Sequence, residues 1–120
     1  MSDIRWLDQP EDHDYPAARS YLNLLYDDKR ADQLVAALKA APAVQFKSKD
    51  IFRAARLALL DKSNSHVARD RDKIKAGDKL SPLLLVRDSV TSCLIIADGY
   101  HRLCAVYSFD EDAVVPCKIV

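Results

Sequence analysis

The chain has 120 residues, of which 49% are hydrophobic and 30% charged, and its 18 basic and 18 acidic side chains give a formal net charge of +0. This length predicts a single domain over residues 1–120, with residues 1–14 as a potentially flexible N-terminal arm. A neutral chain has no long-range positive field to hold it on DNA or on anionic lipid, so we expect no DNA binding without a partner and no membrane association.

The apolar runs indicate a cytoplasmic protein. The acidic start "MSDIRWLDQPEDHDYP" has no apolar signal-peptide region, and no later apolar run approaches the length that spans a membrane. Cys93, Cys104 and Cys117 are an odd number, each within an apolar stretch, which favours reduced core thiols. No close Cys/His spacing such as CxxC is present, so no metal site is predicted.

Two helices are predicted in the first third of the chain. Asp14 can cap a helix with Pro16 in its opening turn, and its apolar face is expected to contain Ala18, Tyr21, Leu22 and Leu25. The same spacing recurs at Ala31, Leu34, Val35 and Leu38, up to Ala41 before Pro42. The short connection between these helices predicts a helical hairpin.

The middle of the chain predicts a short strand and two further helices. Residues 44–48, "VQFKS", alternate in polarity as a strand does, and Ser48 can cap a helix over residues 49–60. A charged helix over residues 66–77 is expected to stop at Gly77, and its charge run is expected to be a solvated face.

The last third predicts buried strands around one helix. Residues 82–86, 93–97 and 113–120 are short apolar runs, and Tyr100, Leu103, Cys104 and Tyr107 share one face of a helix between the last two. Pro116 suggests that the last strand lies at a sheet edge or begins there. The fold class is therefore mixed α/β (α+β), with N-terminal helices in front of a small mixed sheet.

The stretch "ADGYHR" is the strongest functional signal. A strand that enters a glycine and then a helix brings unpaired backbone N–H groups together at the positive end of the helix dipole, and such a point binds anions. Arg102 in the first turn meets a like charge, which an incoming phosphate or carboxylate would reverse. In the alternative interpretation, Asp98 caps the helix and pairs with Arg102, while His101 only contacts solvent.

Residues 77–120, with a glycine, a Pro-led strand, a second strand, a glycine-opened basic helix and a Val-Pro strand, resemble the ParB/sulfiredoxin-like family. The turn "IADGYHR" is similar to the "DGHHR" turn of the ParB-like free serine kinases. That resemblance implies that Asp98, Gly99, His101 and Arg102 face a nucleotide phosphate. The expected ligand is therefore a nucleotide, ATP, ADP or CTP, and any Mg²⁺ is expected to enter with it.

Departures from the family pattern narrow the expected activity. Tyr100 stands where the sulfiredoxin turn has its catalytic cysteine, so we expect no sulfiredoxin activity. His101 replaces the first of the two ParB arginines, whereas Arg102 and Ala105 match that pattern. The chain has no room for the ParB DNA-reading helix-turn-helix, so DNA partitioning is not expected.

Lys79 and His66 are further candidates for contact with the same ligand. Lys79 precedes the Pro82 strand, where the family chain approaches its ligand, so it is a candidate phosphate contact or else a solvated loop residue. His66, at a helix start, can cap the helix, contact a ligand or do neither. Asp70 and Asp72 alternate with basic residues, which predicts mutual neutralisation rather than a metal site.

These observations leave two main hypotheses for function. The first is a nucleotide- or phosphate-binding domain, with phosphoryl transfer or nucleotide hydrolysis at the DGYHR turn and His101 as acid, base or charge stabiliser. The second is a noncatalytic, ligand-gated module that contacts another protein or forms a homodimer. Whether the chain is an enzyme is left open by its residues.

Overall fold

In the computed structural model, which describes residues 3–120, strand β4 (Leu83–Asp88) is buried on both faces. Leu83 and Leu85 pack into one apolar cluster, whereas Leu84 and Val86 pack into another. Successive side chains of a strand point to opposite faces, so a continuous apolar run is what a doubly covered strand requires. The predicted buried strand at residues 82–86 is therefore confirmed, with its physical reason.

The main sheet has four strands in the order β2-β6-β4-β5. Strand β5 (Cys93–Asp98) forms an antiparallel hairpin with β4, and β6 (Val114–Ile119) runs parallel to β4. Strand β2 (Val44–Lys47) pairs antiparallel with β6 at the edge. Helix α5 (Tyr100–Phe109) connects β5 to β6, as the last third of the sequence predicts. The mixed α/β fold class is thus confirmed.

The position of β6 corrects one prediction. Pro116 does not mark an edge, because β6 lies between β2 and β4, and Pro116 is paired with Gln45. On the other side, the ladder with β4 begins only at Cys117, which pairs with Leu83. The proline therefore precedes the stretch in which β6 pairs with β4.

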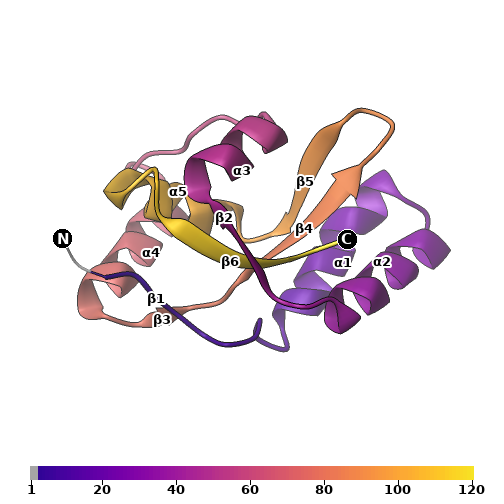
Figure 1. Cartoon of the computed structure of the whole chain (residues 1–120), viewed down its shortest axis with the longest axis horizontal. Helices are drawn as coiled ribbons and strands as arrows, with labels where there is room; N and C mark the ends of the chain where they lie inside the picture. The colour runs from indigo at the N-terminus through magenta and orange to yellow at the C-terminus, as the bar shows by residue number, and fades with distance from the viewer. Residues whose placement is uncertain (1–2) are drawn as a thin grey trace.

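Helices α1 (Asp14–Leu25) and α2 (Asp28–Ala40) form the predicted hairpin and cover the sheet face of Leu84 and Val86. Figure 1 shows the pair at the right-hand end of the molecule. The expected apolar face of α2 is confirmed. That of α1 is only partly buried, because Tyr21 and Leu25 are exposed.

The opposite face is covered by α3 (Ser48–Ala55) and α5, and α4 (Ser65–Ala76) packs against α5 and β3; the three helices share one apolar cluster. Helix α3 is shorter than predicted, since Arg56 adopts a left-handed conformation with φ 57° and ends it. Ser48 is the first residue of this helix, not its cap, because its hydroxyl donates to the carbonyls of Asp110 and Glu111. Gly77 ends α4 as predicted.

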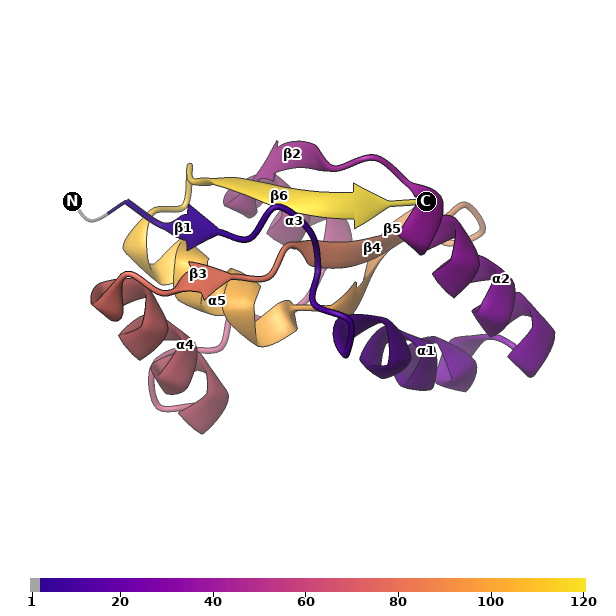
Figure 2. The same ribbon diagram turned by 90° about the horizontal axis from the view of Figure 1, so that it is seen from below.

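A second, two-stranded sheet joins the N-terminal segment to the centre of the fold. Strand β1 (Arg5–Trp6) runs parallel to β3 (Lys79–Leu80), as Figure 2 shows. The Leu7 N–H continues this contact by donating to the Leu80 carbonyl. The described part of the segment 1–14 is thereby brought beside the link between β3 and β4.

The three cysteines are free thiols in this structure. Cys104 and Cys117 are buried, as predicted for core thiols, whereas Cys93 is only half-buried. Burial raises the pKa of the Cys117 thiol to about 11, which keeps it protonated and unreactive.

Candidate functional site

A small polar pocket of about 150 Å³ opens at the N-terminus of α5. Strand β5 ends at Asp98, Gly99 is the N-cap residue, and no side chain caps the helix. The first N–H groups of α5 therefore have no side-chain cap, as an anion site at a helix start requires. Helix α4 closes the other side of the pocket through His66, Arg69, Asp70 and Lys73.

Gly99 is required by both its conformation and its surroundings. Its φ of +110° lies where side chains are rarely tolerated. A Cβ at this position would lie 2.7 Å from Leu83 Cγ and 3.0 Å from Arg102 Nη2. The glycine thus allows β5 to turn sharply into α5 while the buried β4 packs beneath the turn.

Arg102 connects the turn to the link between β3 and β4. Its Nε donates to the Ser81 carbonyl at 3.0 Å, and its Nη2 donates to Asp98 Oδ2 at 3.1 Å and to the Pro82 carbonyl at 3.4 Å. The alternative interpretation predicted an Asp98–Arg102 pair, and this pair is confirmed. It also predicted that Asp98 caps α5, which is wrong. These acceptors offset the repulsion between Arg102 and the helix dipole.

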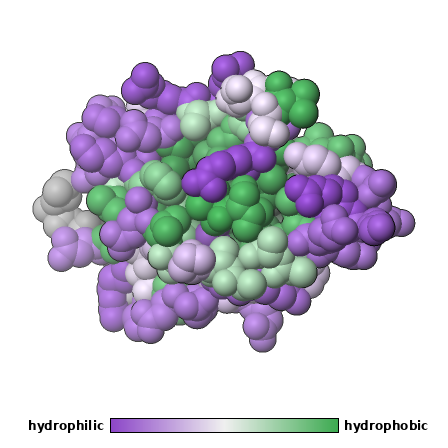
Figure 3. Space-filling model, turned by 45° about the vertical axis from the view of Figure 1, so that its right-hand side comes forward, coloured by the Kyte–Doolittle hydropathy of each residue, from purple (hydrophilic) through white to green (hydrophobic). Residues whose placement is uncertain are grey.

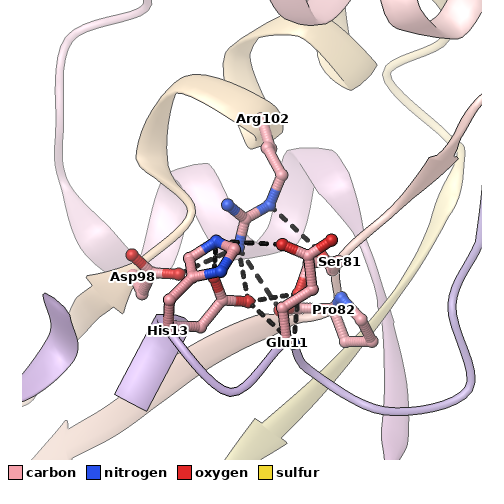
Figure 4. Close-up of polar contacts among 7 residues, drawn as sticks. Glu11, His13, Ser81, Pro82, Asp98 and Arg102 are labelled. Carbon is pink, nitrogen blue, oxygen red and sulfur yellow. Dashed lines mark hydrogen bonds and ion pairs between the residues drawn. The ribbon is translucent and has the colours of Figure 1, made fainter. Parts of the chain in front are cut away.

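A second group of residues reaches Arg102 from the N-terminal segment (Figure 4). Asp14 accepts hydrogen bonds from the Ser81 hydroxyl and from the Glu11 N–H, and its Oδ2 lies 3.9 Å from Arg102 Nη2. The Asp14 side chain is only 4% exposed. The prediction that Asp14 caps the first helix is therefore wrong: α1 begins at Asp14, and the carboxylate is engaged by Glu11 nearby and by Ser81 and Arg102, which are distant in sequence.

Burial dominates the electrostatics of Asp98. Desolvation raises the pKa of this carboxyl, and the nearby Asp14 adds to the effect, while Arg102 opposes it by charge and by hydrogen bonding. The ionised form of Asp98 thus depends on Arg102 for compensation. Any change at Arg102 will alter the protonation of its partner.

His101 and His66 lie against each other inside the pocket, with ring centroids 4.8 Å apart and planes tilted by 40°. Burial lowers the pKa of His101, the charge of His66 lowers it further, and Asp70 opposes both. His101 is therefore held in its neutral form, in which one ring nitrogen can accept a proton. The ligand-contact alternative for His66 has a geometric basis, since its ring lines the pocket.

A histidine titration tests this coupling. We expect the pKa of His101 to lie below its ordinary value of 6.5, and His66→Asn to move it upward because one positive neighbour is removed. As the pH falls, the unfolded chain takes up a proton at this histidine before the folded chain does. His101 therefore contributes stability that is present above pH 6.5 and is lost as the pH falls through the folded pKa. NMR titration of the ring protons measures the shift; an unchanged His101 titration in His66→Asn would contradict the coupling.

One face of the charged helix α4 lines the pocket, which the sequence analysis did not predict. Arg69, Asp70 and Lys73 line the pocket, and within residues 3–120 none of the three forms an ion pair, in contrast to the expected mutual neutralisation. The spacing of His66, Arg69 and Lys73 places them along one side of the helix. This helical spacing is the feature of the sequence from which the pocket-lining face could have been predicted.

Lys79 is placed elsewhere. It is exposed on β3, opposite Arg5 in β1, and is not among the residues that line the pocket. The geometry therefore gives no support to its predicted role as a phosphate contact. Ser81, two residues later, is buried and bonded to Asp14 and Arg102.

One cluster has the donor types of a metal site, which the sequence analysis did not predict. Ligand atoms of Glu11, His13 and Asp14 lie within 4.8 Å of one another. His13 Nε2 already contacts both carboxylates, at 2.9 Å from Glu11 and 3.3 Å from Asp14, and Arg102 adds a positive charge beside Asp14. The two carboxylates are thus already in contact with His13 and Arg102, which leaves them less available to a cation.

Comparison with protein-family models, with curated proteins and with solved structures finds no match to this chain. The resemblance to the ParB/sulfiredoxin-like family therefore stays a prediction from the residues of the turn. Among the helices of residues 3–120, none is both long enough and apolar enough to cross a membrane.

Proposed function

We propose that the pocket at the start of α5 binds the phosphate group of a nucleotide or of another phosphorylated small molecule. The observation that carries the proposal is the meeting of two elements at one small polar pocket: the uncapped start of α5, and the face of α4 with Arg69 and Lys73. Backbone N–H donors and mobile cations around one point are the recurring features of phosphate sites.

The size of the pocket favours recognition of the phosphate alone. Whole small-molecule ligands occupy pockets of about 300–1,000 Å³, whereas this pocket has a volume of about 150 Å³. A bound nucleotide such as ATP, ADP or CTP would place one phosphate in the pocket and leave its sugar and base outside. Magnesium would enter with such a nucleotide.

The cations of the pocket would have different tasks. Arg102 is 17% exposed and engaged by three acceptors, so it sets the shape of the turn; its Nη1 has no hydrogen bond within the described chain. Arg69 and Lys73 are exposed and are not in ion pairs within residues 3–120, so they can move toward an incoming anion. The helix start and Arg102 would orient the phosphate, and the α4 cations would neutralise it.

If the site is catalytic, the reaction it fits is phosphoryl transfer or nucleotide hydrolysis. A neutral His101 in the lining of the pocket would accept a proton from a hydroxyl or a water, while Arg102 and the helix N–H groups stabilise negative charge on the phosphate oxygens. This assignment rests on the position of His101 and on the family resemblance.

A noncatalytic module is the second candidate, and the contacts of Arg102 favour it. Through Ser81 and Asp14, Arg102 is connected to the N-terminal segment. A phosphate that draws Arg102 toward the pocket would weaken these contacts and change the surface available to another protein or to a second copy. This hypothesis requires binding without turnover.

Anion binding is tested with exposed α4 variants that leave the buried contacts intact. We expect ATP, ADP, CTP, pyrophosphate or phosphate to stabilise the protein saturably, and Lys73→Gln or Arg69→Gln to weaken binding about fivefold or more because a charged hydrogen bond is lost. Lys75→Gln is the matched control, since Lys75 is exposed on the same helix but does not line the pocket. Thermal shift and calorimetry, with and without Mg²⁺, provide the measurements.

The outcomes separate the candidates. Equal binding by the two pocket variants and the control, or a flat response to every anion in folded protein, would reject the phosphate site. Binding with product formation that His101→Asn abolishes supports the enzyme. Binding with no product under any condition supports the ligand-gated module.

A further inference from the structure

A second and larger cavity lies away from the phosphate pocket, between α3 and the far end of the sheet. Its volume is about 500 Å³, within the range of about 300–1,000 Å³ that is typical of small-molecule pockets. Figure 3 shows apolar residues gathered at the centre of this side of the molecule, with hydrophilic residues around them. Its apolar lining comes from β2, α3 and the three adjoining strands and consists of Phe46, Ile51, Ala54, Leu85, Leu94 and Ile119.

Helix α3 forms one wall of the cavity through Ile51 and Ala54 and ends at Ala55. Apolar side chains of the sheet beside it stay accessible. Phe46 is 40% exposed, and Leu94 and Ile119 are only half-buried. Leaving such side chains in water forgoes the stabilisation that burial would provide, which favours an apolar occupant.

One charged group in the lining lacks a partner. The Arg87 side chain forms no hydrogen bond or ion pair within residues 3–120, although its backbone N–H pairs with Val120. Asp88 already accepts from the Val90 N–H and the Thr91 hydroxyl. Asp50 lies 3.9 Å from Arg53. Arg87 is thus the cation that the lining offers to a ligand.

We propose that this cavity binds an apolar carboxylate, such as a medium-chain fatty acid or an aryl carboxylate, with the apolar body in the cavity and the carboxylate on Arg87. A guanidinium pairs with a carboxylate through two parallel hydrogen bonds, which fixes the head group at the rim. Asp50 and Asp88 on the same rim repel a multiply charged anion more strongly than a single carboxylate, which favours a monocarboxylate over a nucleotide here. The concave shape favours a small molecule over the flat contact of a second protein.

Cys93 provides a local probe, because it lines this cavity and is the half-buried cysteine, whereas Cys104 and Cys117 are buried. We expect decanoate, kept below its micelle concentration, to slow the alkylation of Cys93 by iodoacetamide saturably. Decanol and decylammonium should require roughly tenfold higher concentrations, because each lacks the carboxylate that pairs with Arg87. Decanoate bound at the phosphate pocket would leave Cys93 unprotected, so this test is independent of the proposed function.

Arg87→Gln should raise the decanoate concentration for half-protection roughly tenfold, since the charged pair is lost. Arg30→Gln is the matched control: Arg30 is an exposed arginine on α2 outside the lining, and its side chain forms no ion pair within residues 3–120, so its loss should change nothing. The proposal is overturned by the absence of protection, by equal protection from decanol, or by an unaltered Arg87→Gln. It is also overturned if Cys93 protection rises with protein concentration alone and sedimentation shows a dimer, because a second copy would then cover the cavity.

Discussion

Gly99→Ala is expected to lower the free energy of unfolding by about 2–4 kcal/mol, because it combines backbone strain with overpacking. An alanine with a φ of +110° is destabilising at any position, because residues with a side chain rarely adopt this backbone conformation. The added Cβ would also lie 2.7 Å from Leu83 Cγ, and Leu83 is buried in β4 and cannot move aside freely. Urea denaturation of the two proteins, followed by circular dichroism, measures the loss.

Gly77→Ala is the matched control for this substitution. Gly77 also has a positive φ, of +80°, but no atom lies within 4 Å of the Cβ that alanine would add. Its cost should therefore be the strain alone, about 1 kcal/mol. Equal losses for the two variants would show that the overlap of the added Cβ with Leu83 and Arg102 is relieved without a cost in stability.

The sequence predicts the elements of this fold well where an apolar period continues over several turns or strands. The α2 face of Ala31, Leu34 and Leu38 is buried as expected, and the apolar run of β4 is covered on both faces. Predictions from the sequence fail where a side chain forms its hydrogen bonds with a partner that is distant in the sequence. Ser48 has the chemistry of a cap, yet its hydroxyl is used by carbonyls at residues 110 and 111, more than 60 positions away.

The part of the candidate site that is formed by neighbouring residues of one turn was predictable from the sequence. The order of strand, glycine and helix places Gly99, His101 and Arg102 at one turn, and the structure confirms their proximity. The contacts that the N-terminal segment makes at the site were not predictable, because nothing in the sequence near Asp14 indicates a contact with Ser81, which lies 67 positions later. Helix periodicity in α4 was present in the sequence, but without a known neighbour it did not distinguish a pocket face from a solvated one.

Arg102→Leu is expected to cost about 3 kcal/mol near neutral pH, because it leaves Asp98 buried as an uncompensated charge and two carbonyls without a donor. Asp98 is 18% exposed, so water replaces the guanidinium only in part. Arg19 offers the contrast, since it also contacts two carboxylates, Asp28 and Asp32, but both of these partners are exposed. Arg19→Leu should therefore have a much smaller effect.

The pH dependence of this loss identifies its cause. Burial already raises the pKa of Asp98, and removing Arg102 raises it further, because Arg102 is the group that lowers it most. A raised acid pKa favours folding below the unfolded value, and that contribution is lost as the pH rises through the folded pKa. The difference between wild type and Arg102→Leu should thus narrow as the pH falls from 7 toward about 4.

A second substitution allows the energy of the Asp98–Arg102 pair to be measured. In the Arg102→Leu background, Asp98→Asn should recover part of the stability at pH 7, because a neutral amide replaces the uncompensated carboxylate. Denaturant titrations of the four proteins of this cycle, at neutral and acidic pH, give the coupling energy between the two side chains. A loss that is independent of pH, or one no larger than that of Arg19→Leu, would mean that the Asp98–Arg102 pair is as weak as an exposed one, and that Arg102 is available to a ligand at little cost to the fold.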